Sequence, residues 1–243
     1  MIDFEQLPAI EMHSHITDAA GIALMRRERL RYALIMDTDN HAAMEAARAN
    51  ADLLGALVWL NPAKAGWMDE ATRYLAAYPD VLKGFKLHPD GDHYRASLDV
   101  LGPLFELANR YGLMIQSHTS DQSGNCNAGL FAPIMQAYPK TTFIAIHGCP
   151  AEEAFALVNA FANVYIDTSY TAWGAGYQKR ALVAAGQQRI VMGLDSPLGF
   201  PSKDGKVEPH FRDAIREICG FYDDDPDVAE CVMYGNARRI LGL

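Results

Sequence analysis

Eight short apolar runs recur along this chain, and helical stretches separate most of them. Strands that are apolar on both faces are typical of a parallel sheet, because helices cover such a sheet on both sides. Eight strands that alternate with helices are the pattern of a (β/α)8 barrel, which commonly takes about 250 residues. The chain has 243 residues. The sequence therefore predicts an α/β fold, a single TIM barrel domain over residues 1–243 with C-terminal helices after the eighth strand.

The predicted strands and helices follow one another in the order that a barrel requires. The strands are expected at Ile10–His15, Tyr32–Asp37, Leu54–Leu60, Leu82–His88, Leu113–His118, Thr142–His147, Val164–Thr168 and Ile190–Asp195. The helices between them are expected at Ala42–Leu54, Trp67–Ala77, Leu98–Tyr111, Glu152–Phe161 and Gln178–Ala185. Within Leu98–Tyr111 the apolar residues form one stripe, and Gly112 stands where a C-terminal cap would.

The tail of the chain has a different composition. Gly199–Val207 contains proline, glycine and three charges, which predict a surface loop. Two helices are expected after it, near Pro209–Cys219 and Asp227–Ile240, separated by the acidic turn Asp223–Pro226. No linker, internal repeat or low-complexity segment divides the chain.

Composition excludes several classes of partner. The net charge of −9 and the pI near 5.3 argue against binding to nucleic acid or to an anionic membrane surface. No apolar run approaches the roughly 18 residues of a membrane-spanning helix, and the start lacks the features of a signal peptide. The four cysteines form no C-x-x-C pair. We expect a cytoplasmic protein that acts on a small molecule. The sequence leaves open whether the protein forms a homo-oligomer.

Five of the apolar runs end in residue types that bind metals or act beside them. Because the carboxyl ends of all strands in a parallel barrel meet at one face, we expect these side chains to share one site. That site favours a metal-dependent hydrolase or a close chemical relative. Its members, in chain order, are His13 and His15, Lys86, His118, His147 and Asp195.

His13 and His15 lie two residues apart in a predicted strand, so their side chains leave the same face. Two imidazoles on one face are the start of a metal site. A lone H-x-H pair is a weak signal, and a pair of hydrogen-bonded histidines at the end of a barrel is the alternative. The other strand ends favour the metal.

His118, His147 and Asp195 extend this group. A single histidine after an apolar run is usually a buried residue with hydrogen-bond partners, but here two strands end in the same way. Asp195 comes just before Ser196 and Pro197, where a turn aspartate is common. An aspartate at this end of a barrel can also bind a metal and serve as a general base.

Lys86 leaves two interpretations open. A lysine inside an apolar strand is unusual, because its ammonium needs a partner. It could be a structural cation that nearby carboxylates neutralise. It could also be carbamylated, which would make it an anionic bridge between two metals. His88 shares the face of Lys86 and is expected to support the site or to contact substrate.

Residues that contact substrate are expected in the loops after the strands. Asn61 and Trp67 follow the third strand and Tyr170 follows the seventh, although each could equally be ordinary loop surface. Gly174-Ala175-Gly176 is too short for a dinucleotide or phosphate loop. No nicotinamide, flavin or pyridoxal cofactor is indicated. Imidazole and carboxylate ligands suit zinc, in one or two ions, with manganese or iron also possible.

Taken together, these motifs resemble the amidohydrolase superfamily, specifically its amidohydrolase-related branch of short metal-dependent barrels. The set is specific at the level of the superfamily, and it occurs in the family's order over nearly the whole chain. The matching segments are Ile10–His15, Gly84–Pro89, Ser117–Thr119, Ile146–Gly148, Gly193–Pro197 and Tyr234–Leu243.

The resemblance implies roles for these residues. His13 and His15 would bind a first metal, which Asp195 completes. His118 would be a ligand of a second metal or, in one-metal members, of the first. His147 would bind the second metal or polarise substrate as a free imidazole. Lys86 matches the bridging carbamate of two-metal members, and Lys86–Pro89 resembles a stretch of dihydroorotases.

Three functions remain open at this stage. The first is hydrolysis of a small ester, lactone or amide by a metal-activated hydroxide, with Asp195 moving the proton. The second is decarboxylation of an aromatic or unsaturated acid, because some members of the branch are lyases with the same ligands. The third is a barrel that binds a metal or ligand without turnover. A fold alone does not choose between them.

Overall fold

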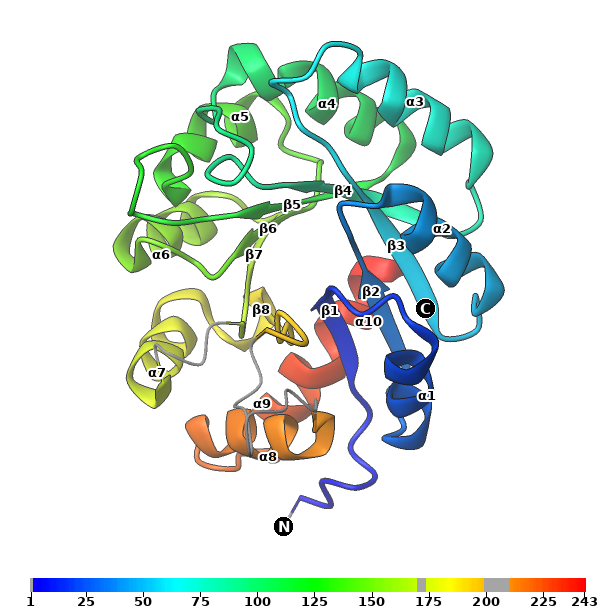
Figure 1. Cartoon of the computed structure of the whole chain (residues 1–243). Coiled ribbons are helices and arrows are strands. Elements are labelled where there is room, and N and C mark those ends of the chain that lie inside the picture. Colours follow the sequence, from blue (N-terminus) through cyan, green and yellow to red (C-terminus); the bar gives the residue numbers. More distant parts are fainter. Residues whose placement is uncertain (1, 170–173, 199–209) are drawn as a thin grey trace.

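The computed structural model describes residues 2–169, 174–198 and 210–243. Its strands form one eight-stranded parallel sheet in chain order, which curves around a centre with helices outside it (Figure 1). The predicted (β/α)8 barrel is therefore confirmed. The strands are β1 (Ile10–Ser14), β2 (Tyr32–Ile35), β3 (Leu54–Trp59), β4 (Leu82–Leu87), β5 (Met114–His118), β6 (Phe143–Ile146), β7 (Val164–Asp167) and β8 (Ile190–Val191).

Most strands end one or two residues earlier than predicted, and β8 has only two residues. For β8 the reason is the buried side chain of Glu11, which accepts a hydrogen bond from the Leu194 amide at 2.9 Å. A side chain here takes the place of a backbone partner, so the ladder stops early. Backbone bonds from Met12 to Met192 and from Ser196 to His13 still close the barrel between β8 and β1.

The helices largely match the predictions, with three corrections. The first is that α1 and α5 were not predicted. The second is that α2 ends at Ala49, because Leu54, the predicted helix end, begins β3. The third is that the predicted helix Asp227–Ile240 is divided by a π-helical turn at Cys231–Gly235. The helices are α1 (Ala19–Arg27), α2 (Asn40–Ala49), α3 (Trp67–Ala77), α4 (Leu98–Tyr111), α5 (Ala132–Ala137), α6 (Ala151–Ala160), α7 (Gly174–Ala185), α8 (Phe211–Phe221), α9 (Pro226–Glu230) and α10 (Asn236–Leu241), with short 3-10 turns at Ala128–Phe131 and Gln187–Arg189.

The caps of α4 show how the sequence sets the ends of a helix. The Ser97 hydroxyl accepts a hydrogen bond from the Val100 amide at the start. At the end, Gly112 has a φ of 66°, in the left-handed region that glycine adopts at little cost. The predicted glycine cap is therefore confirmed.

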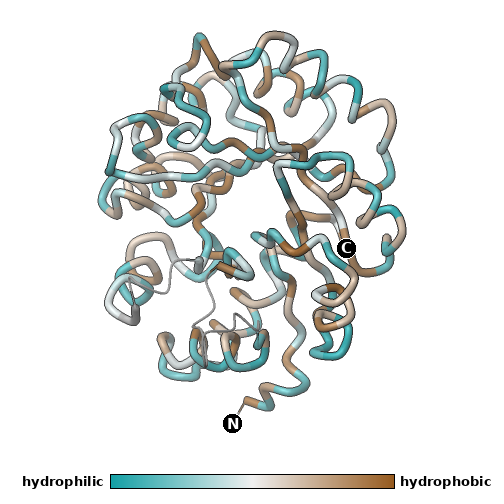
Figure 2. The backbone as a smooth tube through the Cα atoms, viewed as in Figure 1, coloured by the Kyte–Doolittle hydropathy of each residue, from teal (hydrophilic) through white to brown (hydrophobic). Residues whose placement is uncertain are grey.

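Two apolar layers hold the fold together. The larger one lies between the strands and the outer helices, and the smaller one fills the barrel interior. Figure 2 shows hydrophobic residues along the strands and mixed colours along the helices that face solvent. Tyr234, Ile240 and Leu241 of the C-terminal helical segment pack against the inner layer, and Ile240 and Leu241 lie near the first residues of β4 and β5. This plug closes one end of the barrel, so the carboxyl end is left for a site. None of the helices in the described part of the chain has the length and apolar character that crossing a membrane requires.

Close contact between β4 and β5 depends on Gly84. A Cβ at this position would lie 2.1 Å from the backbone oxygen of Met114, which cannot move without breaking the sheet. We expect Gly84→Ala to lower the free energy of unfolding by about 2–3 kcal/mol, measured by denaturant titration. The control is Gly220→Ala in α8, where a Cβ meets nothing within 4 Å. Gly220→Ala should be neutral or stabilise by up to about 1 kcal/mol. Equal stability of the two variants would contradict this packing.

Candidate metal centre

A cavity of about 320 Å³ lies at the carboxyl ends of the strands. It brings together every residue predicted to bind metal, and His88 beside them. Three further side chains in its wall, Asp37, Thr38 and Trp59, follow or end β2 and β3. The described residues that line it are His13, His15, Asp37, Thr38, Trp59, Lys86, His88, His118, His147, Asp195 and Leu198.

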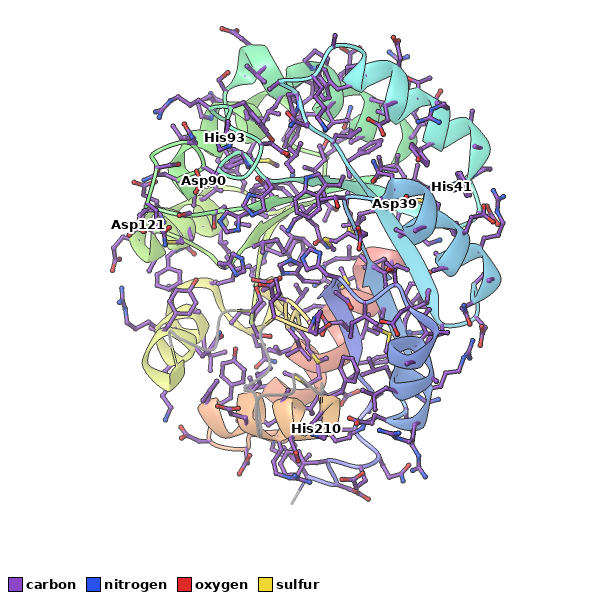
Figure 3. The ribbon with its side chains drawn as sticks, viewed as in Figure 1. Asp39, His41, Asp90, His93, Asp121 and His210 are labelled. Atoms are coloured by element: carbon purple, nitrogen blue, oxygen red, sulfur yellow. The ribbon has the colours of Figure 1, made fainter. Side chains whose placement is uncertain are left out.

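The three residues predicted to contact substrate from the loops lie elsewhere or cannot be placed. The Asn61 side chain donates to Asp92 at 3.0 Å, and Trp67 starts α3 and packs against the core. Neither is among the described residues that line the cavity. Tyr170 falls outside the described residues. Of the eight histidines, His41, His93 and His210 do not line the cavity, and they are labelled in Figure 3.

Three ligand atoms converge at one point of the cavity. The Nε2 atoms of His13 and His15 lie 3.3 and 3.2 Å from Oδ1 of Asp195. These residues form a group whose ligand atoms all lie within 4.8 Å of one another. In a tetrahedral zinc site, neighbouring ligand atoms stand about 3.3–3.4 Å apart, because each lies about 2.0–2.1 Å from the ion. The spacing therefore fits a metal ion of this size.

The contacts of the Nδ1 atoms of His13 and His15 show why the Nε2 atoms are acceptors. Nδ1 of His15 lies 3.2 Å from the carbonyl oxygen of Met36, which can only accept a hydrogen bond. Nδ1 of His13 lies 3.2 Å from Oδ2 of Asp167. Both Nδ1 atoms therefore carry the hydrogen, and the Nε2 lone pairs face the Asp195 carboxylate. Three electron-rich atoms this close require a positive charge between them, which a proton, an ammonium or a metal ion can supply.

Asp167 is a residue that the sequence analysis missed. It ends β7, is fully buried, and accepts three hydrogen bonds: from Nδ1 of His13, from the backbone amide of His147 at 2.8 Å, and from the Ser169 hydroxyl. Ser169 in turn accepts from Nδ1 of His147 at 3.0 Å. Burial raises the pKa of Asp167, although these donors oppose the rise. One carboxylate therefore orients two of the predicted metal ligands.

Gly193 allows this arrangement. A Cβ at Gly193 would lie 2.7 Å from Oδ2 of Asp167 and 3.1 Å from Cβ of His13. Any larger residue would push the strand ends apart at the point where the carboxylate meets the imidazole. The glycine in the motif Gly193–Pro197 therefore serves the site through close approach.

His147 and Asp195 hold strained backbones. Their φ angles are 68° and 53°, in the left-handed region that residues other than glycine rarely adopt. Such strain costs roughly 1–2 kcal/mol for an ordinary residue and clusters at functional sites. Burial raises the pKa of Asp195, but the close contacts with His15 and His13 outweigh this effect, so the pKa lies well below its usual value. Asp195 is therefore a carboxylate.

Among the described residues that line the cavity, Lys86 carries the ammonium. It is 1% exposed, and its Nζ lies 3.1 Å from Nε2 of His13. Burial lowers the pKa of Lys86 to about 8, although Asp195 and Asp167 favour the ammonium. The ammonium thus donates to the same lone pair that a metal ion would use.

Aromatic rings form one wall of the cavity. The His88 ring stacks on His118 at 4.0 Å, and Trp59 lies parallel to His88 at 5.6 Å. The Trp59 indole donates to Asp92 at 3.0 Å, which fixes its orientation. Burial lowers the pKa of His118 to about 2, with help from His88, so His118 is neutral. The sequence analysis treated Trp59 only as part of a strand.

We expect Lys86→Met to stabilise the chelator-treated protein near pH 7. The pKa of Lys86 falls from 10.5 in the unfolded chain to about 8 in the fold, so the unfolded state binds more protons between these values. The wild type therefore gains stability as pH rises through this window. Below it, the buried ammonium costs on the order of 3 kcal/mol. Denaturant titrations across the window should show the variant's advantage shrink.

Lys83→Met is the control, because Lys83 lies on the same strand with its ammonium near the surface. An advantage of Lys86→Met that does not change with pH would contradict the buried ammonium.

We expect Asp167→Asn to weaken metal binding by about 10–100-fold, because the carboxylate no longer holds His13 and His147 in their orientation. The measurement is competition for zinc with a chelator of known affinity. Asp37→Asn removes the same charge from the cavity wall, where the Asp37 carboxylate accepts from the Asp39 amide. Equal losses in the two variants would show that charge alone matters.

Comparisons with known proteins found a family model and several similar solved structures. The family model described as Amidohydrolase matches residues 12–243. No curated protein matches the chain in sequence. A solved structure of a probable 2-pyrone-4,6-dicarboxylic acid hydrolase from Acinetobacter baumannii, with citric acid bound, is similar over 97% of this chain and 99% of its own. Its sequence identity is 12% and its TM-score is 0.73.

Two decarboxylase structures are similar as well. The 5-carboxyvanillate decarboxylase of Sphingomonas paucimobilis covers 98% of this chain and 100% of its own, at 14% identity and a TM-score of 0.66. A dihydroxybenzoic acid decarboxylase from a Polaromonas species, with bound manganese and the inhibitor 2-nitroresorcinol, covers 97% of each chain at 13% identity, with a TM-score of 0.66. At these identities, the likeness shows the shared fold.

Proposed function

This chain belongs to the amidohydrolase family of enzymes, and from that premise we propose that it is a metal-dependent hydrolase of a small ester, lactone or amide. One observation carries the proposal: the lone pairs of His13 and His15 converge with the Asp195 carboxylate at the spacing of a tetrahedral ion. These three residues would hold the ion, with zinc the best match to the donors and manganese or iron as alternatives.

A divalent ion held there would supply the positive charge that lowers the pKa of a water molecule toward about 7. The residues of the chain then manage the proton and the substrate. Asp195 would hold the ion with one carboxylate oxygen, and it could accept the proton of the attacking water. It returns that proton to the alcohol or amine that leaves, which completes the hydrolysis.

Lys86 and His147 line the same cavity. The Lys86 ammonium is placed to polarise a carbonyl oxygen or to pair with a substrate carboxylate. Nδ1 of His147 carries a hydrogen, which it donates to the Ser169 hydroxyl. Nε2 is therefore an acceptor and can bind a second ion or take a proton. In this proposal Lys86 acts as a free ammonium, since carbamylation would remove the hydrogen bond to His13.

Decarboxylation of a planar acid is the second candidate. The parallel stack of Trp59, His88 and His118 gives the cavity a flat wall, on which an aromatic ring can stack. Lys86 would then pair with the carboxylate that is lost. Two similar structures are named as decarboxylases, and one of them contains manganese. Both candidates use the same three ligands.

The test is a panel of small lactones, esters, amides and aromatic acids, presented to the enzyme after loading with zinc, manganese or iron. We expect acid release from an ester, lactone or amide, recorded as proton production. Carbon dioxide release without hydrolysis would instead establish the lyase.

His13→Ala should lose most of the bound metal and at least about 100-fold in kcat/KM, because the variant lacks the imidazole that Asp167 orients toward the ion. A metal-supplemented wild type without bound metal by elemental analysis would refute both candidates.

A further inference from the structure

His88 lines the cavity but has no part in the hydrolysis proposed for the ion ligands and Lys86. It follows β4 directly and leaves the chain on the same face as Lys86, which comes two residues earlier. Each nitrogen of an imidazole presents either a hydrogen or a lone pair, and the hydrogen bonds of the ring decide which. What His88 offers to a substrate therefore depends on the position of one hydrogen.

The loop after β4 determines that position. The backbone amide of Gly91 donates to Nδ1 of His88 at 3.0 Å. Because a backbone amide can only donate, Nδ1 has its lone pair there and carries no hydrogen. The ring is therefore neutral and holds its hydrogen on Nε2. His15 is the opposite case, since its Nδ1 donates to the carbonyl oxygen of Met36 and its Nε2 has the lone pair.

The turn from His88 to Asp92 keeps the Gly91 amide in place. The Asp92 amide donates to the carbonyl oxygen of His88 at 2.9 Å, which closes the turn. A Cβ at position 91 would lie 3.1 Å from Nδ1 of His88, so the glycine allows the amide to approach the ring. The contact comes from backbone atoms of a closed turn, and it holds the ring in one tautomer.

The faces of the His88 ring are covered by two neighbouring rings. The ring lies nearly parallel to those of His118 and Trp59, with centroids 4.0 and 5.6 Å away. Because β4 lies between β3 and β5 in the sheet, His88 lies between these two residues. Both faces and the Nδ1 edge are thus occupied, and the Nε2 edge is left for the cavity. No described residue accepts a hydrogen bond from Nε2.

We propose that His88 is a fixed, neutral hydrogen-bond donor whose Nε2 hydrogen binds an oxygen of the substrate beside the Lys86 ammonium. The identity of that oxygen rests on the proposed function. In hydrolysis it is the carbonyl oxygen, which gains negative charge when water attacks and then accepts a stronger hydrogen bond. In a substrate that carries a carboxylate it can be an oxygen of that group. A neutral imidazole N–H is known to polarise a carbonyl in this way.

The alternative is a structural histidine whose only task is to accept from Gly91. Two substitutions separate the alternatives. Asparagine at position 88 keeps an acceptor near the place of Nδ1 but has nothing at the place of Nε2. Glutamine is longer and brings an amide hydrogen close to the place of Nε2. A structural role therefore favours the asparagine variant, whereas a donor role favours the glutamine variant.

The first measurement is the tautomer. In the nitrogen-15-labelled, chelator-treated full chain, long-range correlations between ring hydrogens and ring nitrogens distinguish a protonated nitrogen from a bare one. We expect one pattern with a bare Nδ1 and a protonated Nε2 near neutral pH, and this pattern should be missing from His88→Gln. A hydrogen on Nδ1 of His88 would overturn the proposal, whatever the activity of the enzyme.

The second measurement compares His88→Asn with His88→Gln in the zinc-loaded enzyme, on the substrate that the panel identifies. We expect His88→Asn to lose at least about 100-fold in kcat/KM and His88→Gln to stay within about 10-fold of wild type. A loss in kcat assigns the donor to the carbonyl oxygen, and a loss confined to KM assigns it to a substrate carboxylate. Equal losses in the two variants would contradict a donor role.

His93→Asn is the matched control. His93 lies on the same loop, where Figure 3 labels it, and it is not among the described residues that line the cavity. Its φ of 57° is one that asparagine tolerates well. This variant should keep the kcat/KM of the wild type. Circular dichroism of each variant checks that it has folded.

Acetate separates this proposal from the proposed function, because its binding requires no turnover. We expect the dissociation constant of acetate, measured from the shifts of the His88 region in the same spectra, to be at least about 3-fold higher in His88→Asn than in His88→Gln. Equal affinities, or no binding by the wild type, would overturn the donor even in an active hydrolase. An inactive wild type that shows the Nε2 hydrogen and this difference would refute the proposed function alone.

Discussion

The carboxylate of Asp167 is the interaction on which the site depends. It lies buried at the end of β7 and accepts hydrogen bonds from β1 through His13, and from the residue after β6 through the His147 amide. The bond to Nδ1 of His13 turns Nε2 of that ring toward the cavity. Ser169, which donates to Asp167, holds Nδ1 of His147 in the same way. Gly193 leaves the space for this carboxylate. A buried carboxylate that is not itself a proposed metal ligand therefore orients two residues that are.

The site lowers the stability of the fold, and the apolar burial in the barrel offsets this loss. His147 and Asp195 keep positive φ angles, and Lys86 is an ammonium with almost no contact with water. A continuous core inside and outside the sheet supplies the apolar burial that outweighs these terms. The C-terminal helical segment contributes by closing the opposite end of the barrel. Function and stability are therefore divided between the two ends of the strands.

Sequence reasoning predicted the barrel and brought together its strand-end residues because both follow from one geometric rule. Parallel strands present their carboxyl ends at one face, so His13, Lys86 and His118 could be grouped without knowledge of distances. The role of Asp167 was not predicted because its partner His13 lies 154 positions away, and an aspartate after an apolar run resembles a turn residue. The parallel with Asp195, which also follows an apolar run, was the available signal. The two-residue length of β8 depends on the side chain of Glu11, which no local pattern reports.

On the proposed function, Lys86 and a metal ion would compete for the same lone pair, which would account for a lysine in a buried strand. Nε2 of His13 faces a carboxylate and needs a hydrogen, which the Lys86 ammonium donates at 3.1 Å. The ammonium is also attracted to Asp195 and Asp167. An ion that took the lone pair would displace the bond to His13 and leave the ammonium without its nearest partner. The ammonium would then pair with a carboxylate of the substrate. The same residue would therefore orient His13 before an ion binds and, once it has bound, favour a substrate with negative charge.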